Sequence, residues 1–283
     1  MDTDEVRLDD ALEGVQRLVD EPDSRRGGSG ARRVRERGFV PDRVFERDDV
    51  QQCRLRTTVV RTSSAEASSS GAGSSVPRFG ENGGGVPSGG SVSVGPVVLE
   101  GLVRRAQAAP RLGSTRLVII DGPAGSGKTT LADQLAEALS AQVVHMDDLY
   151  DGWNGMLAGV DRLGRQVLEP MAAGRDGRYQ RYDWYAGEYA DWHDVPQAEH
   201  LIVEGCGAGA RRFDGLSTLL VWVEAGPAEC LTRTVARDGE GAREHLRAWM
   251  RAERAVYQAE GTARRADVRI NGQGLVTWPG TGV

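Results

Sequence analysis

Lysine is almost absent from this chain. Of the 35 lysine and arginine residues among 283, only Lys128 is a lysine. Cysteine is scarce too, because Cys53, Cys206 and Cys230 are too few and too widely spaced for a disulfide framework or a zinc site. We therefore expect reduced thiols.

Long apolar runs and an excess of positive charge are also missing. No apolar run approaches the length of a transmembrane helix, and the acidic first residues do not resemble a signal peptide. The net charge of -6 argues against a nucleic-acid-binding surface, which would be basic. These absences predict a soluble, cytoplasmic protein without nucleic-acid or membrane partners, and they leave the oligomeric state open.

The first 95 residues contain little that could form a core. Residues 71–95 are rich in glycine and serine, which is typical of a flexible linker. Residues 1–62 mix acids and arginines without sustained apolar periodicity, which predicts disorder with one short helix over 6–21. We predict a disordered arm over 1–95, either a dispensable tail or a partner-binding arm, and one domain over 96–283.

Five short apolar runs follow, separated mostly by segments with helical spacing. The runs lie at 115–122, 141–148, 200–207, 218–225 and 266–272. The helical segments lie at 97–109, 129–140, 228–238 and 242–260. This order predicts an α/β three-layer sandwich with a five-stranded parallel sheet buried on both faces, and a polar, aromatic insertion over 149–196.

Acidic residues stand at the carboxyl ends of four of these runs. They are Asp121, Asp147 with Asp148, Glu204 and Glu224. Ligands of parallel α/β sheets bind beyond this edge. The cluster therefore predicts a metal and phosphate site there.

A glycine-rich loop directly follows the first run. Gly122, Gly127, Lys128 and Thr129 fit the pattern G-x-x-x-x-G-K-[ST] between a strand and a helix, which predicts a P-loop NTPase fold rather than an accidental turn. The loop N–H groups would hold the phosphates of ATP, Lys128 would reach the β- and γ-oxygens, and Thr129 would bind Mg²⁺. The predicted nucleotide-binding residues are Gly122, Pro123, Ala124, Gly125, Ser126, Gly127, Lys128, Thr129 and Thr130.

The position of the single lysine fits this interpretation. Arginine has replaced lysine wherever a positive charge on a flexible stem is sufficient. Between crowded phosphate oxygens, the slim ammonium of Lys128 is preferred to a planar guanidinium. We therefore predict that Lys128 cannot be exchanged for arginine.

Asp147 follows the second run and is a candidate general base. A carboxylate there can accept the proton of a hydroxyl that attacks the γ-phosphate. The alternative is a helix cap or a charged turn.

In its glycine loop and in the acidic end of its second run, the chain resembles the uridine kinase-like P-loop kinases, a group that includes phosphoribulokinase and bacterial pantothenate kinase. Their second strand ends in D-x-[FY]-Y or D-D-F-Y, similar to the stretch from Asp147 to Tyr150. The resemblance implies that Asp147 is the base and that Tyr150 lines the acceptor pocket.

Three further stretches resemble this family. "LIVEGCG" implies that Glu204 lies near the metal. "CLTRTVARD" is similar to a lid in which Arg233 and Arg237 clamp the transferring phosphate, and their spacing places both on one helix face. "YQRYDWYAGEYADWH" resembles an acceptor-binding segment; the residues implied are Tyr182, Asp183 and Trp184.

The insertion is dense in aromatic residues. Between 179 and 192 lie Tyr179, Tyr182, Trp184, Tyr185, Tyr189 and Trp192. Such rings can form a wall for a planar or ring-shaped substrate, or a small satellite core. The sequence as a whole predicts an ATP- and Mg²⁺-dependent kinase that phosphorylates a hydroxyl of a small molecule. The first candidate for this acceptor is a nucleoside such as uridine. The alternatives are a kinase of the same fold for pantothenate, a sugar phosphate or a nucleotide, and a nucleotide-binding switch or ATPase.

Overall fold

The computed structural model describes residues 93–277. The arm predicted over 1–95, except its last three residues, lies outside this range, as do the helix predicted over 6–21 and Cys53.

The helical elements are α3 (Pro96–Ala106), α4 (Lys128–Leu139), η1 (Met146–Asp148), α5 (Met156–Arg162), η2 (Leu163–Leu168), α6 (Glu169–Ala172), η3 (Arg211–Phe213), α7 (Pro227–Asp238), η4 (Glu240–Ala242), α8 (Arg243–Glu260) and α9 (Thr262–Arg265). The strands are β1 (Arg116–Asp121), β2 (Gln142–His145), β3 (Gly177–Asp183), β4 (Glu188–Val195), β5 (His200–Glu204), β6 (Ser217–Glu224), β7 (Val268–Asn271) and β8 (Val276–Thr277).

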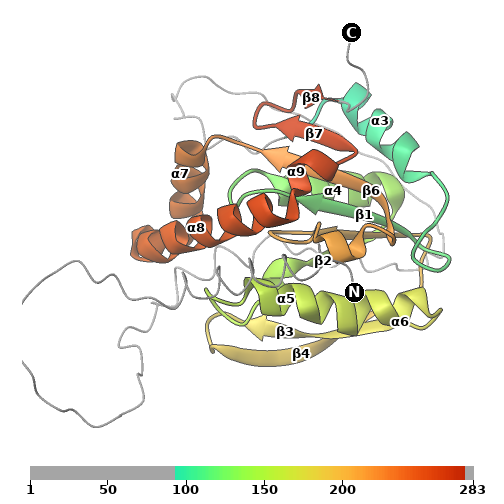
Figure 1. Ribbon diagram of the computed structural model, residues 1–283, viewed down its shortest axis with the longest axis horizontal. Helices are drawn as coiled ribbons and strands as arrows, with labels where there is room; N and C mark the ends of the chain where they lie inside the picture. The colour runs from blue at the N-terminus through green and yellow to red at the C-terminus, as the bar shows by residue number, and fades with distance from the viewer. Residues whose placement is uncertain (1–92, 278–283) are drawn as a thin grey trace, which may run out of the picture.

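The main sheet has the strand order β2-β5-β1-β6-β7-β8 (Figure 1). The first five of these strands are the five predicted runs, and they pair in parallel. The sequence did not predict β8, which adds an antiparallel edge next to β7. The predicted α/β sandwich with a parallel sheet is confirmed.

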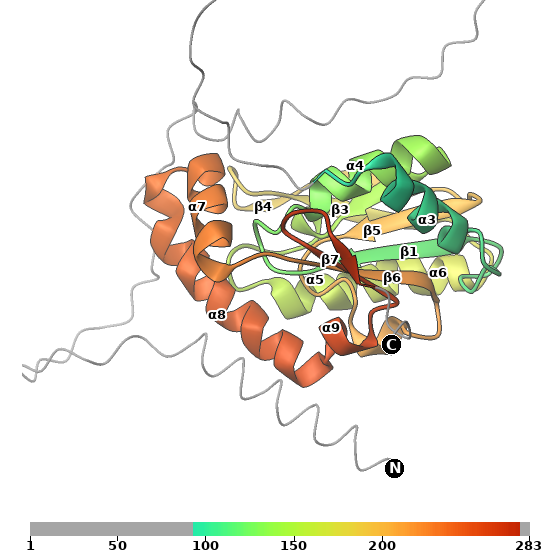
Figure 2. The ribbon, with the colours of Figure 1, turned by 90° about the horizontal axis from the view of Figure 1, so that it is seen from above.

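The sheet is apolar on both faces because its strands are apolar at successive positions. In β1, Leu117 and Ile119 pack in the core on the side of α5 and α8, while Val118 and Ile120 pack on the side of α3 and α4. Neighbouring residues of a strand point to opposite faces, so a continuous apolar run needs cover on both. Figure 2 shows α3 and α4 on one side of the sheet and α8 and α9 on the other.

The predicted insertion contains its own secondary structure. Its first half is helical from α5 through α6, with a π-helical turn at Leu163–Leu168. Its second half is an antiparallel hairpin of β3 and β4 beneath α5 and α6 (Figure 1). Asp183 closes the hairpin, since its Oδ1 accepts hydrogen bonds from the N–H groups of Tyr185 at 2.9 Å and Ala186 at 3.1 Å. The insertion is therefore a folded unit against the main sheet.

Between residues 93 and 277, no helix has the length and apolar character needed to cross a membrane. Within the same range, Cys206 and Cys230 are free, and both are buried.

Candidate active site

The glycine loop connects β1 to α4, as predicted. Gly122 has φ +149° and Gly125 has φ +79°, conformations that favour glycine. A Cβ at Gly122 would lie 1.9 Å from the carbonyl oxygen of Val223, and one at Gly125 would lie 2.6 Å from that of Cys230. The loop therefore packs too closely on β6 and α7 for side chains at these positions.

The amino end of α4 can accept an anion. Gly127 precedes the helix and provides no side-chain cap, so the N–H groups of the first turn have no side-chain acceptor from it. These N–H groups and the positive end of the helix dipole form a site that suits a phosphate group. This end of α4 fits the phosphates of a nucleotide.

Lys128 begins α4 and is buried, with 6% of its surface exposed. Its Nζ donates a hydrogen bond to the carbonyl oxygen of Pro123 at 2.9 Å and lies 3.7 Å from Sγ of Cys206. Burial opposes its charge, but the charges of Cys206, Glu204 and other acidic neighbours raise the pKa of Lys128 above its ordinary value. The ammonium is therefore held charged in a confined space.

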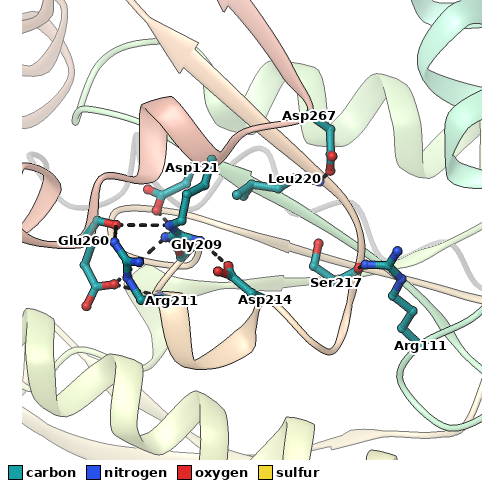
Figure 3. A network of polar contacts seen from close by, with 10 residues as sticks. Arg111, Asp121, Gly209, Arg211, Asp214, Ser217, Leu220, Glu260 and Asp267 are labelled. Atoms are coloured by element: carbon teal, nitrogen blue, oxygen red, sulfur yellow. Dashed lines mark hydrogen bonds and ion pairs between the residues drawn. The ribbon is translucent and has the colours of Figure 1, made fainter. Parts of the chain in front are cut away.

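Asp121, at the end of β1, is fully buried and holds the loop after β5. Its Oδ1 accepts hydrogen bonds from the N–H groups of Gly122 and Gly207, and its Oδ2 accepts one from Gly209 at 2.8 Å. The hydroxyl of Tyr257 lies 2.9 Å from Oδ1. Figure 3 shows Asp121 and Gly209 in a polar network that reaches Glu260 of α8. The carboxylate of Asp121 is therefore occupied in holding the backbone of these loops and is not a free metal ligand.

Thr129 and Glu204, the two predicted metal ligands, lie together. The Oγ1 of Thr129 donates to Oε1 of Glu204 at 3.1 Å, and Nδ1 of His145 lies 2.7 Å from the same oxygen. Burial opposes protonation of His145, but Glu204 raises its pKa to about 9. In the described residues, no group of three or more His, Cys, Asp or Glu side chains could hold a metal ion. Two converging oxygens fit Mg²⁺, which takes its other ligands from phosphates and water.

Asp147 lies in η1, directly after β2, and is exposed. Although the residue is exposed, desolvation by the surrounding protein is the largest cause that raises its pKa, while the charges of Arg237 and Lys128 act in the opposite direction. The indole Nε1 of Trp184 donates to its backbone carbonyl at 2.8 Å. Its carboxylate is thus available and lies within the electrostatic reach of the loop lysine and of α7.

The two predicted lid arginines lie on α7. Arg233 donates to the carbonyl oxygen of Gly125 at 3.3 Å and forms an ion pair with Glu229. Arg237 is half exposed and contacts Asp238 at 2.6 Å. One arginine therefore touches the glycine loop, and the other acts on Asp147.

The four predicted acceptor residues have different environments. Tyr150 is 1% exposed, its hydroxyl donates to the carbonyl oxygen of Cys206 at 2.6 Å, and its ring packs edge-on against Trp249. Asp183 serves the hairpin turn. Tyr182 and Trp184 are half-buried and in mutual contact, with ring centroids 5.6 Å apart. Trp184 lies beside Asp147 and Tyr182 packs against Trp184. Contact of any of the four residues with an acceptor stays a prediction.

The sequence did not reveal the role of Glu253. This residue of α8 is 3% exposed; its Oε2 accepts a hydrogen bond from the N–H of Ala124 at 3.0 Å and lies 3.3 Å from Sγ of Cys206. Burial raises the pKa of Glu253, against the opposing effects of Ala124 and Lys128. The only available signal was a carboxylate on the apolar side of an amphipathic helix, which does not identify its partner.

We expect Glu253→Ala to lower the free energy of unfolding by about 1–3 kcal/mol, because the buried N–H of Ala124 loses its acceptor. Glu253→Gln keeps an acceptor oxygen. Since the folded pKa is raised, wild-type stability is lost as pH rises from the ordinary value of 4.5 through the folded value. The glutamine variant should therefore gain stability relative to the wild type as the pH of urea unfolding is raised above 4.5. Parallel pH profiles of the two proteins would contradict this account.

Comparisons with known proteins agree with this geometry. Residues 118–254 match the family described as "AAA domain". The chain is 28% identical over 172 residues to a shikimate kinase of Corynebacterium efficiens, across 55% of this chain and 87% of that protein. It is 30% identical over 176 residues to a tRNA dimethylallyltransferase of Cereibacter sphaeroides, across 60% of this chain and only 55% of that protein.

A solved structure described as a possible uridine kinase from Bacillus stearothermophilus is 20% identical to this chain. The two superpose with a TM-score of 0.45, across 60% of this chain and 96% of that one. The glycine loop between β1 and α4 and the parallel sheet agree with the P-loop NTPase fold predicted from the sequence.

Proposed function

We propose that this chain, which has the P-loop kinase fold, transfers the γ-phosphate of ATP to a hydroxyl group of a small molecule, with a nucleoside such as uridine as the first candidate. One observation carries the proposal: Asp147 stands exposed directly beyond β2, whose last residue lies opposite Glu204, the residue that bonds Thr129 of the loop helix. A base for the acceptor, a phosphate-binding lysine and a cation on the opposite helix are the parts that phosphoryl transfer requires.

In this reaction, the acceptor oxygen forms a bond to the γ-phosphorus and the bond to the bridging oxygen of ADP breaks. The proton of the hydroxyl passes to the carboxylate of Asp147. Lys128 and the N–H groups at the start of α4 would hold the phosphates, and Arg233 and Arg237 would face the transferring group. Mg²⁺, when bound, would neutralise charge on the phosphate oxygens; Thr129 and Glu204 would hold it.

The hairpin supports an acceptor role for the insertion. Trp184 binds the backbone of Asp147, and its ring contacts Tyr182 and also Trp153 at 5.3 Å. Aromatic rings present flat apolar faces with polar edges, which suits a ring-bearing acceptor. A switch protein has no need of a base with an aromatic surface beside it, so these residues favour a kinase over a nucleotide-binding switch or simple ATPase.

The decisive experiment measures ADP release from ATP and Mg²⁺ with a panel of acceptors, followed by mass spectrometry of the products. The panel contains nucleosides, nucleotides, hydroxy acids and sugar phosphates, and reactions without acceptor give the bare ATPase rate. We expect at least one acceptor to raise ADP release and to gain one phosphate. If none does, the proposed function is wrong.

A further inference from the structure

Arg162, the last residue of α5, has an unusual environment. Its Cζ lies 4.0 Å from the centroid of the Tyr189 ring, so the guanidinium lies over an aromatic face. Its Nε is buried and has no hydrogen-bond partner within residues 93–277. Burying part of a cation without a partner is unfavourable, so an acceptor that bonds this guanidinium would be stabilised there.

Three other arginines of the insertion differ in this respect. Arg165 pairs with Asp161, Arg178 with Asp194, and Arg181 with Asp191. No ion pair of Arg162 occurs in the part of the chain that the structure describes. A guanidinium that lies on a ring keeps its edge available for a bidentate contact to a carboxylate or phosphate.

Arg162 connects to the proposed base through a row of aromatic rings. Tyr189 contacts Tyr182 with centroids 5.2 Å apart, Tyr182 contacts Trp184 at 5.6 Å, and Trp184 donates to the backbone of Asp147. The hydroxyl of Tyr182 makes no hydrogen bond within the described residues, and it is a second donor on the same surface. The row therefore has a base at one end and a cation at the other.

We propose that Arg162 forms, together with Tyr182 and Tyr189, a subsite that binds a carboxylate or phosphate group of the acceptor. This inference rests on the proposed kinase function. The phosphorylated molecule is then a hydroxyl compound that already carries negative charge. This favours a hydroxy acid, sugar phosphate or nucleotide over the neutral nucleoside that the sequence resemblance suggests as the first candidate. The charges of Arg162 and Asp151 both act on Tyr189, so the cation offsets the repulsion that Asp151 would exert on an anion there.

A purely structural role for Arg162 is the competing explanation, because a cation over Tyr189 also fastens α5 to the hairpin. The test therefore needs variants that separate packing from anion binding. Arg162→Met keeps the stem on the ring without charge, and Arg162→Lys keeps a charge without the planar fork. Arg165→Met is the matched control, since Arg165 lies on the same helical segment and its charge is already paired.

The first measurement is equilibrium binding by calorimetry to the full chain carrying Asp147→Asn, with ADP and Mg²⁺ present. The probes are glycerate, ribose 5-phosphate and neutral uridine, so the two anion arms distinguish a carboxylate from a phosphate. We expect one anionic probe to bind, and Arg162→Met to weaken it about 10-fold or more, the range of a lost charged hydrogen bond. Arg165→Met should bind it as well as the parent.

The second measurement is steady-state kinetics with the best acceptor. Arg162→Met should raise the acceptor KM, leave the KM for ATP unchanged, and keep the wild-type unfolding midpoint. Failure of both anionic probes to bind, or equal binding by Arg162→Met, would overturn the subsite even if a neutral acceptor were phosphorylated. A different outcome is also possible: an anionic probe binds in a manner that depends on Arg162, but no acceptor stimulates ADP release. That outcome would overturn the kinase function and leave the anion subsite standing.

Discussion

Lys128→Arg is expected to lower kcat/KM for phosphoryl transfer about 100- to 1,000-fold, the range measured when one preorganised charge-stabilising donor is lost. The ammonium is 6% exposed and packs between the carbonyl oxygen of Pro123 and Sγ of Cys206. A guanidinium is larger and planar, so it cannot occupy this space and also leave room for the phosphates. Affinity for ATP should fall together with turnover.

The measurement is calorimetric ATP binding and initial rates, with urea unfolding to show that the variant is folded. Lys128→Met fits the same space without charge, so it tests the charge even if the arginine variant is unstable. Arg247→Lys, an exposed position paired with Glu244, is the control for the exchange itself and should behave as wild type. Full ATP affinity and turnover in Lys128→Arg would refute the assignment of the nucleotide site.

Asp147→Asn is expected to reduce acceptor phosphorylation by about 100- to 10,000-fold, the range for loss of a general base. ATP binding should be retained, because Asp147 lies beyond β2 and no hydrogen bond within residues 93–277 ties its carboxylate to the glycine loop. Its exposure means that the substitution removes no core packing. Because the pKa of Asp147 is raised, wild-type turnover should decline on acidification already above the ordinary carboxylate range.

The neighbouring Asp148→Asn is a matched control, since that carboxylate accepts a hydrogen bond from the hydroxyl of Tyr179 at 3.0 Å. It should retain most of the transfer rate. Both variants are assayed for acceptor-dependent ADP release and for binding of an ATP analogue. Transfer within about threefold of wild type in Asp147→Asn, well below the ~100-fold loss of a base, would exclude this residue as the base.

The local signals in the sequence were sufficient for the sheet and the loop. Each parallel strand is a short apolar run, because both of its faces are buried, and the glycine loop is contiguous, so its residues meet without help from distant parts of the chain. The same signals missed β8, which is only two residues long, and the internal structure of the insertion.

What the sequence by itself determined is therefore the order of strands and helices and the position of the phosphate-binding loop, since both depend on neighbouring residues. Only the tertiary structure brought Glu253 to the N–H of Ala124, 129 residues away in the chain, and placed Arg162 over Tyr189. It also showed that Tyr150 points into the core while Tyr182 and Trp184 do not. Such contacts depend on how whole elements pack, and periodicity within one element carries no information about its partner.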